Sequence, residues 1–359
     1  EDLQKHNIVI TTYGTLRSDV QLLMKINFDY LILDESQAIK NPASKVTRAA
    51  CLLNAKNRLC MSGTPLQNNT FDIFAQMNFL NPGLLGNMEF FRNEFATPID
   101  KFGEQDQKEH LRKLLFPFIL RRTKEQVAKD LPDKTETILF CEMENEQRKI
   151  YDAYRNSYRE KILGTIDEQG IAKSQLTILQ GLMKLRQICD SPAILNEEEK
   201  YPNHSIKLDE LAREIEENIG DHKALIFSQF LGMLALIKKK LVEDNIQFEY
   251  FDGSTSAPDR EKAIQNFQNN DECRVFLISL KAGGVGLNLT AADYVYIVDP
   301  WWNPAVEQQA IDRTHRIGQT KNIFAYRMIC IDTIEDKILQ LQERKRKLAS
   351  ELIADDASF

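Results

Sequence analysis

Short apolar runs alternate with helical segments along the last third of the chain, and this alternation restricts the possible folds more than any other feature. From about Lys223 onward five such runs are each bounded by polar turns: ALIF at 224–227, FEYF at 248–251, VFLIS at 275–279, YVYIV at 294–298 and IFAYRMI at 323–329. Between the second and third runs, Ser256 with Pro258 just inside is a helix start signal. Strands that alternate with helices in this way form βαβ units with a parallel sheet. The sequence therefore predicts a doubly wound α/β domain from 223 to about 330.

The first part of the chain carries a weaker form of the same pattern. Three strand-like runs, at 7–13, 28–35 and 57–65, end in polar or glycine-containing loops. Three strands are too few for a stable sheet of this kind, so we expect either that the sheet begins before residue 1 or that the segment depends on a neighbour. The N-terminus has no initiator Met, and we expect that residue 1 is not the natural start.

The pattern of residues 70–200 predicts mostly helix. One strand-like run interrupts them at 135–143, and the polar, proline-containing stretch 196–205 is the best candidate for a linker. With 359 residues the chain is too long for one compact core, which agrees with two α/β segments flanking a helical region.

Composition excludes several classes of protein. The six cysteines form no CxxC pair, which argues against a disulfide framework and a structural zinc site and favours a reducing compartment. No apolar stretch approaches the roughly 20 residues that a membrane span needs. The net charge of −7 means that any contact with nucleic acid must come from local basic patches.

Two acidic residues, Asp34 and Glu35, follow directly after the apolar run YLIL, at the expected carboxyl end of a buried parallel strand. Open α/β sheets bind their ligands at that edge. One carboxylate there can hold a magnesium ion while the other orients an attacking water, although two acids alone are also typical of a strand that simply ends in solvent. Ser62–Pro65 ends a second apolar run in the matching position, as a stiff turn that can sense a phosphate or contact a neighbouring domain.

Two later segments carry residues suited to phosphate. The loop 279–290 contains Gly283, Gly284 and Gly286, which allow a backbone to approach a nucleotide closely, or make a flexible connection. In 299–319, Asn303 as cap and Pro304 predict a helix that Gly318 closes.

On that expected helix Gln309, Arg313 and Arg316 are spaced to share one face, which suits a phosphate ligand better than an apolar neighbour; a solvated charged face is the alternative. Trp301 and Trp302 fit either a core or a platform for a nucleic-acid backbone.

Seven segments, in order along nearly the whole chain, resemble motifs of the Swi/Snf-type branch of the superfamily-two helicase-like ATPases, whose motors translocate on double-stranded DNA. They are ITTYGTL (10–16) for motif Ib, DESQ (34–37) for motif II, SGTPLQNN (62–69) for motif III, FILRRTKEQVAKDLPDK (118–134) for the lobe-linking stretch, KALIFSQF (223–230) for motif IV, SLKAGGVGLNLT (279–290) for motif V and DPWWNPAVEQQAIDRTHRIGQ (299–319) for motif VI. The resemblance implies two RecA-like lobes, the first incomplete in this chain.

The resemblance also implies roles for individual residues. Asp34 would organise Mg²⁺, Glu35 would be the catalytic base, and Arg313 and Arg316 would be arginine fingers reaching ATP from the second lobe. The remaining assignments are Gly284, Gly286 and Gln309 to the nucleotide, and Thr11, Thr12, Ser228, Gln229, Lys281 and Trp302 to duplex DNA.

Two departures from the family pattern bear on activity. Ser36 and Gln37 stand where the family usually has Ala and His, so we expect altered coupling between ATP and DNA with magnesium binding kept. None of the 15 glycines is followed by lysine, so the chain has no Gly-Lys-Ser/Thr phosphate-binding loop. The family carries that loop upstream of motif Ib, and we expect this chain to be the carboxyl-terminal part of a longer protein and to be inactive alone.

The resemblance implies four parts: a partial lobe at 1–69, a helical insertion and lobe connection at 70–200, a second lobe at 201–332, and a C-terminal helix at 333–359. That helix, with a basic cluster at 344–347, resembles the family's brace helix but also fits a solvated end.

The implied function is that of a fragment of an ATP-dependent double-stranded DNA translocase that remodels protein–DNA complexes. The alternatives are a strand-separating helicase of the same superfamily and a non-catalytic DNA- or protein-binding module. The expected partners are duplex DNA, a DNA-bound protein complex and the upstream half of the first lobe. Segment 185–195 lacks the Asn-His-Pro sequence of nuclear remodellers, so we expect a bacterial cytoplasm, at the nucleoid; the nucleus would apply to a eukaryotic chain.

Overall fold

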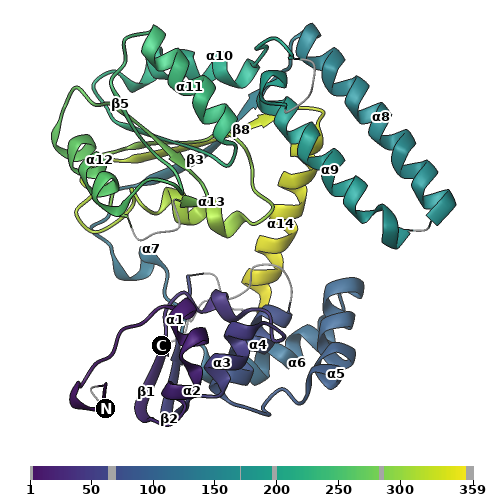
Figure 1. Cartoon of the computed structure of the whole chain (residues 1–359), viewed down its shortest axis with the longest axis vertical. Coiled ribbons are helices and arrows are strands. Elements are labelled where there is room, and N and C mark those ends of the chain that lie inside the picture. The colour runs from purple at the N-terminus through teal and green to yellow at the C-terminus, as the bar shows by residue number, and fades with distance from the viewer. Residues whose placement is uncertain (1–2, 64–69, 170, 196–199, 283–286, 353–359) are drawn as a thin grey trace. The chain divides into compact units, whose positions relative to one another are not determined.

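The computed structural model describes residues 3–63, 70–169, 171–195, 200–282 and 287–352 (Figure 1). The chain divides into two compact units. The first comprises Glu1–Thr123 with Arg344–Phe359, and the second comprises Lys124–Glu343. Each unit is described by itself.

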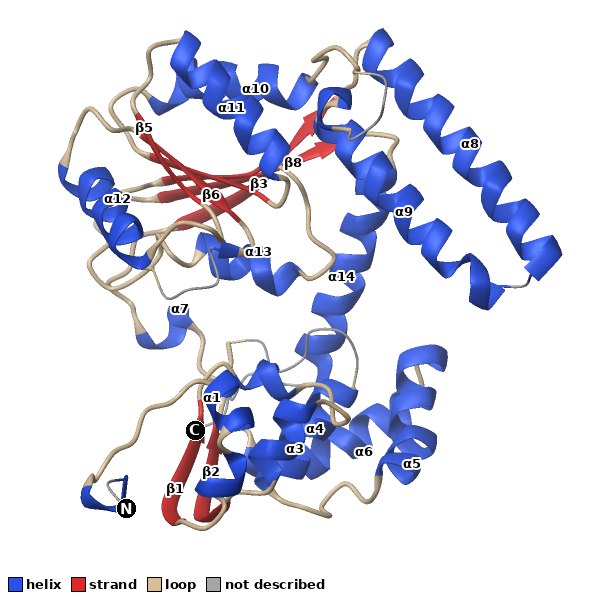
Figure 2. Ribbon diagram, viewed as in Figure 1, coloured by secondary structure: helices blue, strands red, loops and turns tan. Residues whose placement is uncertain are grey.

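The second unit is built on a six-stranded sheet in which all the paired strands run parallel, with the order β3-β8-β7-β4-β6-β5 (Figure 2). The strands are β3 (Lys134–Cys141), β4 (Ala224–Ser228), β5 (Phe248–Phe251), β6 (Val275–Ser279), β7 (Tyr294–Ile297) and β8 (Ile323–Cys330). Strands β4 and β6 are buried at every position, as expected of apolar runs covered on both faces. The doubly wound parallel sheet predicted from the sequence is confirmed.

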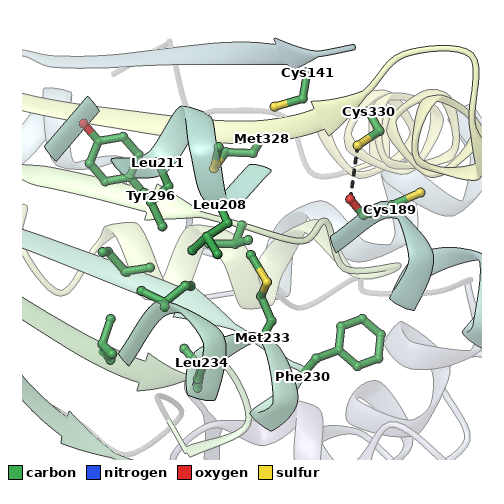
Figure 3. Packing of buried hydrophobic residues seen from close by; sticks show 14 of the residues in the cluster. Cys141, Cys189, Leu208, Leu211, Phe230, Met233, Leu234, Tyr296, Met328 and Cys330 are labelled. Carbon is green, nitrogen blue, oxygen red and sulfur yellow. Dashed lines mark hydrogen bonds between the residues drawn. The ribbon is translucent and has the colours of Figure 1, made fainter. Parts of the chain in front are cut away.

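Helices cover both faces of this sheet (Figure 2). Helices α10 (Ile206–Glu214) and α11 (Leu231–Glu243) pack on one face, where Figure 3 shows Leu208, Leu211, Met233 and Leu234 against Tyr296 and Met328. Helices α12 (Ala257–Asn269) and α13 (Pro304–Ile311) cover the other face. Side chains alternate along a strand, so Ile226 of β4 enters the first core while Leu225 and Phe227 enter the second. The predicted start of α12 is confirmed, since the Ser256 hydroxyl accepts from the Asp259 amide at 3.3 Å.

The strand-like run at 135–143 joins this sheet. The sequence pattern predicts it as part of a helical insertion at 70–200, whereas in the structure β3 pairs with β8 from Lys134↔Ile323 to Cys141↔Cys330. The second unit therefore begins at Lys124, not at 201, and its sheet has six strands where five were expected. Strand pairing across some 190 residues leaves no trace in the local periodicity, which explains the difference.

Charged side chains stabilise this edge of the sheet. Glu136 on β3 accepts from Arg327 of β8 at 2.6 Å and lies 2.7 Å from Lys134. Burial alone would raise the pKa of Glu136, but the hydrogen bond from Lys134 and the charge of Arg327 outweigh it and lower the pKa to about 2. Arg327 also donates to the buried Glu307 of α13 at 3.0 Å. The network thus joins β3, β8 and α13.

Two long antiparallel helices, α8 (Asn145–Gln169) and α9 (Ile171–Asp190), form a hairpin that extends from the sheet (Figure 1). They approach closely where Gly181 faces Tyr158; a Cβ at position 181 would lie 2.8 Å from Tyr158 Cδ1. The 3₁₀ turn η6 (Pro192–Ile194) follows, and the π-turn η7 (Ile215–Ile219) ends α10. Short helix α7 (Lys124–Val127) precedes β3.

The first unit contains a two-stranded parallel sheet, β1 (Asn27–Leu33) with β2 (Asn54–Cys60). Its helices are α1 (Tyr13–Ser18), α2 (Val20–Leu23), α3 (Lys45–Cys51), α4 (Phe71–Leu80), α5 (Met88–Phe91) and α6 (Gln105–Leu115), with short 3₁₀ or π turns at Leu3–Lys5, Ser36–Ile39, Arg92–Ala96, Pro98–Phe102 and Phe116–Phe118. One core gathers Leu33, Ile39 and Phe79, and a second gathers Phe74, Phe91 and Leu111. Of the two predicted strands that do form, β1 covers 27–33 where 28–35 was predicted, and β2 starts three residues earlier than 57. The expectation that β1 is a buried strand is wrong, since Tyr30 and Ile32 are exposed and only Leu33 is buried.

The predicted strand at 7–13 does not form. Residues 7–12 are irregular, and α1 begins at Tyr13. Ile8 and Ile10 remain 81% and 93% exposed, so this segment has the side chains of a strand without a partner strand among the described residues. An extended segment needs neighbouring main-chain groups to become part of a sheet, and residue pattern alone does not supply them.

Helix α14 (Ile334–Leu352) follows β8, and its first half is anchored in the second unit. Glu335 pairs with the buried Lys207 at 2.6 Å, and Gln342 donates to Glu307 at 2.6 Å. The part of the helix up to Glu343 is therefore packed onto the unit that precedes it. Within the described ranges, none of the helices has the length and apolar character needed to cross a bilayer.

Candidate nucleotide and DNA site

The acidic pair expected at the end of a strand lies there. Asp34 directly follows β1, and the Glu35 amide donates to Asp34 Oδ1 at 2.9 Å. Glu35 has φ 47°, in the left-handed region that non-glycine residues seldom adopt, as the chain turns into the 3₁₀ segment Ser36–Ile39. Both carboxylates are exposed. These oxygen ligands fit the preference of Mg²⁺, and Asp34 stays the predicted metal ligand.

The two residues that depart from the family pattern connect this pair to the second strand. Gln37 donates through Nε2 to Glu35 Oε2 and accepts from the Ser62 hydroxyl at 2.8 Å. Ser36 is buried, with its amide on the Met61 carbonyl at 2.9 Å and its hydroxyl on Gln76 Oε1 at 2.8 Å. Hydrogen bonds therefore link the acidic loop to the loop after β2, the two loops that resemble motifs II and III.

The segment that resembles motif Ib also contacts the acidic loop. Tyr13 donates its hydroxyl to the Asp34 carbonyl at 2.7 Å. Burial, with a smaller contribution from Asp34 and Glu35, raises the pKa of Tyr13 to about 12, so the phenol stays protonated. Thr12 caps α1 by accepting from the Thr15 amide at 3.1 Å. Thr11 and Thr12 are exposed, and their assignment to DNA stays a prediction.

In the second unit the carboxyl ends of β4 and β7 are joined by one carboxylate. Asp299 accepts from the Gln229 amide at 3.0 Å and from the Ser228 hydroxyl. Ser228 and Asp299 are fully buried, and Gln229 is 9% exposed. The Ser228 hydroxyl is thus buried and hydrogen-bonded within the protein, which argues against the direct DNA contact predicted for Ser228. No role for Asp299 was predicted from the sequence, because Asp299 lies beside Ser228 only through the pairing of β7 with β4 in the sheet.

A buried arginine at the end of α9 supports the same edge. The Arg186 guanidinium lies 5.4 Å from the Phe230 ring centroid and 5.6 Å from those of Trp301 and Trp302, and it donates to the Pro300 carbonyl. A cation stacked among aromatic faces fixes the positions of the rings around it. Trp302 is half-buried and stays a predicted DNA contact. No local pattern indicated a role for Arg186, since its partners are far from it along the chain.

The segment with the paired arginines is not one continuous helix. Asn303 caps α13 and Pro304 opens it, as predicted, but the helix ends at Ile311. Residues 312–318, which we call the arginine turn, then leave the helix, and Gly318 has φ +101°. The predicted shared helix face is therefore wrong.

Tertiary hydrogen bonds hold the arginine turn. Leu289 donates its amide to the Arg313 carbonyl at 3.1 Å, and Gln319 Nε2 donates to the carbonyls of Thr314 and Ala292 at 3.2 and 2.9 Å. Such contacts replace the i to i−4 bonds that would have continued the helix.

The turn presents its two arginines differently. Arg313 is 4% exposed and donates to the Leu287 carbonyl at 3.4 Å. Arg316 is half-buried, with Nε on the Asp312 carbonyl at 3.3 Å. Gln309 on α13 is also half-buried. Lys281 is exposed just after β6, whereas Gly284 and Gly286 lie outside the described residues. The nucleotide and DNA roles of these residues stay predictions.

A second cluster with potential metal ligands lies in the interior. Cys189, Cys330 and Glu335 bring ligand atoms within 4.8 Å of one another. Glu335 already accepts from the Lys207 ammonium at 2.6 Å and the Cys330 amide at 2.8 Å, and Cys330 Sγ donates to the Cys189 carbonyl at 3.3 Å (Figure 3). Burial raises the pKa of both thiols, so they are protonated. This cluster is core packing with its hydrogen bonds satisfied.

Comparison with known proteins agrees with this arrangement of motifs. Residues 1–194 match the SNF2-related domain. The chain belongs to the SNF2-related family. Residues 206–318 of this SNF2-related chain match the helicase conserved C-terminal domain. The first match extends past Lys124 into the second structural unit, and both matches agree with the motifs found in the sequence.

Related proteins include a bacterial and a eukaryotic example. An uncharacterized ATP-dependent helicase of Mycoplasma pneumoniae is 38% identical over 356 residues, which cover 99% of this chain and 33% of that protein. A TATA-binding protein-associated factor of Saccharomyces cerevisiae is 32% identical over 98% of this chain and 22% of its own length. The SNF2-related chain thus spans about a third or less of the length of these relatives.

A solved structure confirms the fold. The SWI2/SNF2 ATPase core of Sulfolobus solfataricus, in complex with double-stranded DNA, is 39% identical to this chain, with a TM-score of 0.53. The match covers 98% of this chain and 74% of that one. The prediction of RecA-like lobes with parallel sheets is therefore confirmed.

Proposed function

We propose that this chain is the catalytic part of an ATP-dependent double-stranded DNA translocase that remodels protein–DNA complexes. The observation that carries the proposal is the hydrogen-bonded connection from Ser62 through Gln37 to Glu35, beside Asp34 at the end of β1. Because Gln37 links Glu35 to Ser62, the position of the proposed base Glu35 can change when the loop after β2 binds a ligand. Membership of the SNF2-related family supports ATP as the nucleotide.

The proposed chemistry divides between the two units. Asp34 would hold Mg²⁺, which would supply positive charge to the phosphates, and Glu35 would accept the proton of the attacking water. Arg313 and Arg316 would place positive charge near the phosphate oxygens as the transition state forms, which is the usual way that proteins stabilise that charge. Activity would therefore need both units. Because the sequence has no Gly-Lys-Ser/Thr loop, residues 1–359 alone would turn over ATP poorly.

Duplex DNA is the proposed track. The DNA-bound Sulfolobus core supports this choice over strand separation, and the likeness to a TATA-binding protein-associated factor supports action on a protein bound to DNA. Exposed Thr11, Thr12 and Lys281, together with Trp302, would contact the phosphate backbone.

The test replaces Glu35 by Gln in the full-length protein. We expect DNA-stimulated ATP hydrolysis to fall by about 100-fold or more while ATP binding is kept, because a general base contributes roughly that factor. Glu109→Gln, an exposed acid on α6 paired with Lys113, is the matched control and should leave the rate unchanged. Displacement of a triplex-forming strand from duplex DNA then separates translocation from strand separation. A Glu35→Gln protein that hydrolyses ATP at the normal rate would refute the proposal.

A further inference from the structure

The chain segment that leads into the second unit is fastened to the arginine turn at three points. Lys124 Nζ lies 3.0 Å from Asp312 Oδ1 and donates to the His315 carbonyl at 2.8 Å. His315 Nε2 lies 2.9 Å from the Pro132 carbonyl oxygen, which can only accept, so the imidazole donates there. These contacts join residues 124–132, which we call the entry segment, to both sides of Arg313.

The arginine turn needs such support because it has left the helix. Local turn bonds hold part of its path, such as the Thr314 amide on the Ile311 carbonyl at 3.1 Å, and Lys124 adds a long-range contact that binds the side chain of residue 312 and the carbonyl of residue 315 together. A single ammonium that bonds both ends of a four-residue stretch fixes the path between them. Arg313 lies inside that stretch, and Arg316 follows it directly.

These contacts contribute more to position than to stability. The Lys124 and Asp312 side chains are 37% and 31% exposed, so the ion pair is partly solvated and stabilises the fold weakly. Cationic groups that act on a transition state must be held to within roughly 0.5 Å, by contacts that are themselves ordered. Removing Lys124 should therefore leave the unit folded with its arginines less well placed.

We propose that Lys124 and His315 are positioning residues through which the entry segment holds the arginine turn. Lys124 is the first residue of the second unit, so the chain that connects the two units reaches the arginine turn through it. A change in the path of that connection would be transmitted to Arg313 by the same bonds. The consequence for catalysis rests on the proposed function, whereas the tether itself does not.

The test uses the full-length protein with Lys124→Met, which removes the ammonium and keeps most of the apolar stem, and Lys124→Arg, which keeps a cation able to reach both acceptors. The control is Lys239→Met, an exposed lysine of the same unit that pairs with Glu243. Three quantities are measured: kcat and KM for ATP, hydrogen exchange of the amides at 312–319, and the urea midpoint read from tryptophan fluorescence.

We expect Lys124→Met to lower kcat by about 10-fold or more with KM within about twofold, because misplacement of a charged group acts on the transition state. Exchange at 312–319 should rise about 10-fold with the urea midpoint unchanged, since only local ordering is lost. Lys124→Arg should restore both quantities, and Lys239→Met should change neither.

Unchanged exchange in Lys124→Met overturns the proposal, whatever the activity. So does a loss of kcat that Lys124→Arg fails to restore. If the unmodified protein does not hydrolyse ATP, the proposed function fails, and the exchange measurement alone then decides whether the entry segment tethers the turn.

Discussion

Replacing Lys207 by Met should destabilise the second unit strongly. Lys207 is fully buried, and its ammonium lies 3.0 Å from Asp190 Oδ1, 2.6 Å from Glu335 Oε1 and 2.7 Å from the Val298 carbonyl oxygen. Burial alone would lower the pKa of Lys207, but the two carboxylates outweigh it and raise the pKa, so the ammonium is charged. Removing one partner of a buried pair typically costs about 3–5 kcal/mol.

A lower bound on the magnitude follows from the two carboxylates left behind. Burial raises the pKa values of Asp190 and Glu335, and without Lys207 a carboxyl must bind a proton to stay buried; the bound counts Glu335 alone. Starting from its ordinary value of 4.5, keeping it protonated at pH 7 costs about 3 kcal/mol, at 1.36 kcal/mol for each pKa unit. The folded variant then holds a proton that the unfolded chain has released, so its stability rises as the pH falls. At pH 5 this lower bound shrinks to about 1 kcal/mol.

Urea unfolding followed by tryptophan fluorescence measures this directly, because the chain has two tryptophans and both, Trp301 and Trp302, lie in the second unit. Lys239→Met is the control. It removes the exposed ion pair with Glu243 and should lower the free energy of unfolding by less than about 0.5 kcal/mol. The double variant Lys207→Met with Glu335→Gln should recover much of the loss at pH 7. A Lys207→Met loss below about 1 kcal/mol at pH 7, or one that grows toward pH 5, would refute the reasoning.

Three further perturbations test other parts of the structure. The depressed pKa of Glu136 stabilises the folded parent protein above the ordinary carboxyl pKa, and this stability is lost as the pH falls from about 4.5 toward 2. Glu136→Gln should remove this contribution. Acid unfolding followed by tryptophan fluorescence shows whether the variant has lost this pH dependence of stability. Gly181→Ala should loosen the α8–α9 hairpin by about 1–2 kcal/mol, since its Cβ would press on the base of the Tyr158 ring and outweigh the gain in helix propensity; faster hydrogen exchange confined to the hairpin is the expected sign, and unchanged exchange contradicts it. Asp299→Ala should leave the buried Gln229 amide without its acceptor and cost about 1–3 kcal/mol in the urea assay, while a neutral result would show that the carboxylate is dispensable.

Much of the candidate site could be predicted from the sequence because it lies where strands end. Apolar runs identify strands, and the next polar residues then lie at the carboxyl edge of a parallel sheet, which located Asp34 and Glu35 after β1 and Gln229 after β4. Cap signals of two or three residues were equally dependable, as the starts of α12 and α13 show.

The sequence did not predict how those edges are supported. Nothing in the run 135–143 indicates that its partner is β8, and nothing in the sequence at the start of α10 indicates that Lys207 is fully buried between two acids. Arg186 and Asp299 were missed for the same reason, because their partners lie more than 40 residues away along the chain.

The sequence by itself determined the order of strands and helices, the carboxyl-edge placement of the acidic pair and the family, because these depend on periodicities and motifs that span a few residues. The tertiary structure alone decided that the helix ends at Ile311, so that Arg313 and Arg316 lie on a turn, and that the strand at 7–13 does not form. Both outcomes depend on which partners distant parts of the chain offer to the main-chain groups. The Leu289 amide and the Lys124 ammonium bond the carbonyls of residues 313 and 315 in the turn, whereas Ile8 and Ile10 find no strand partner among the described residues.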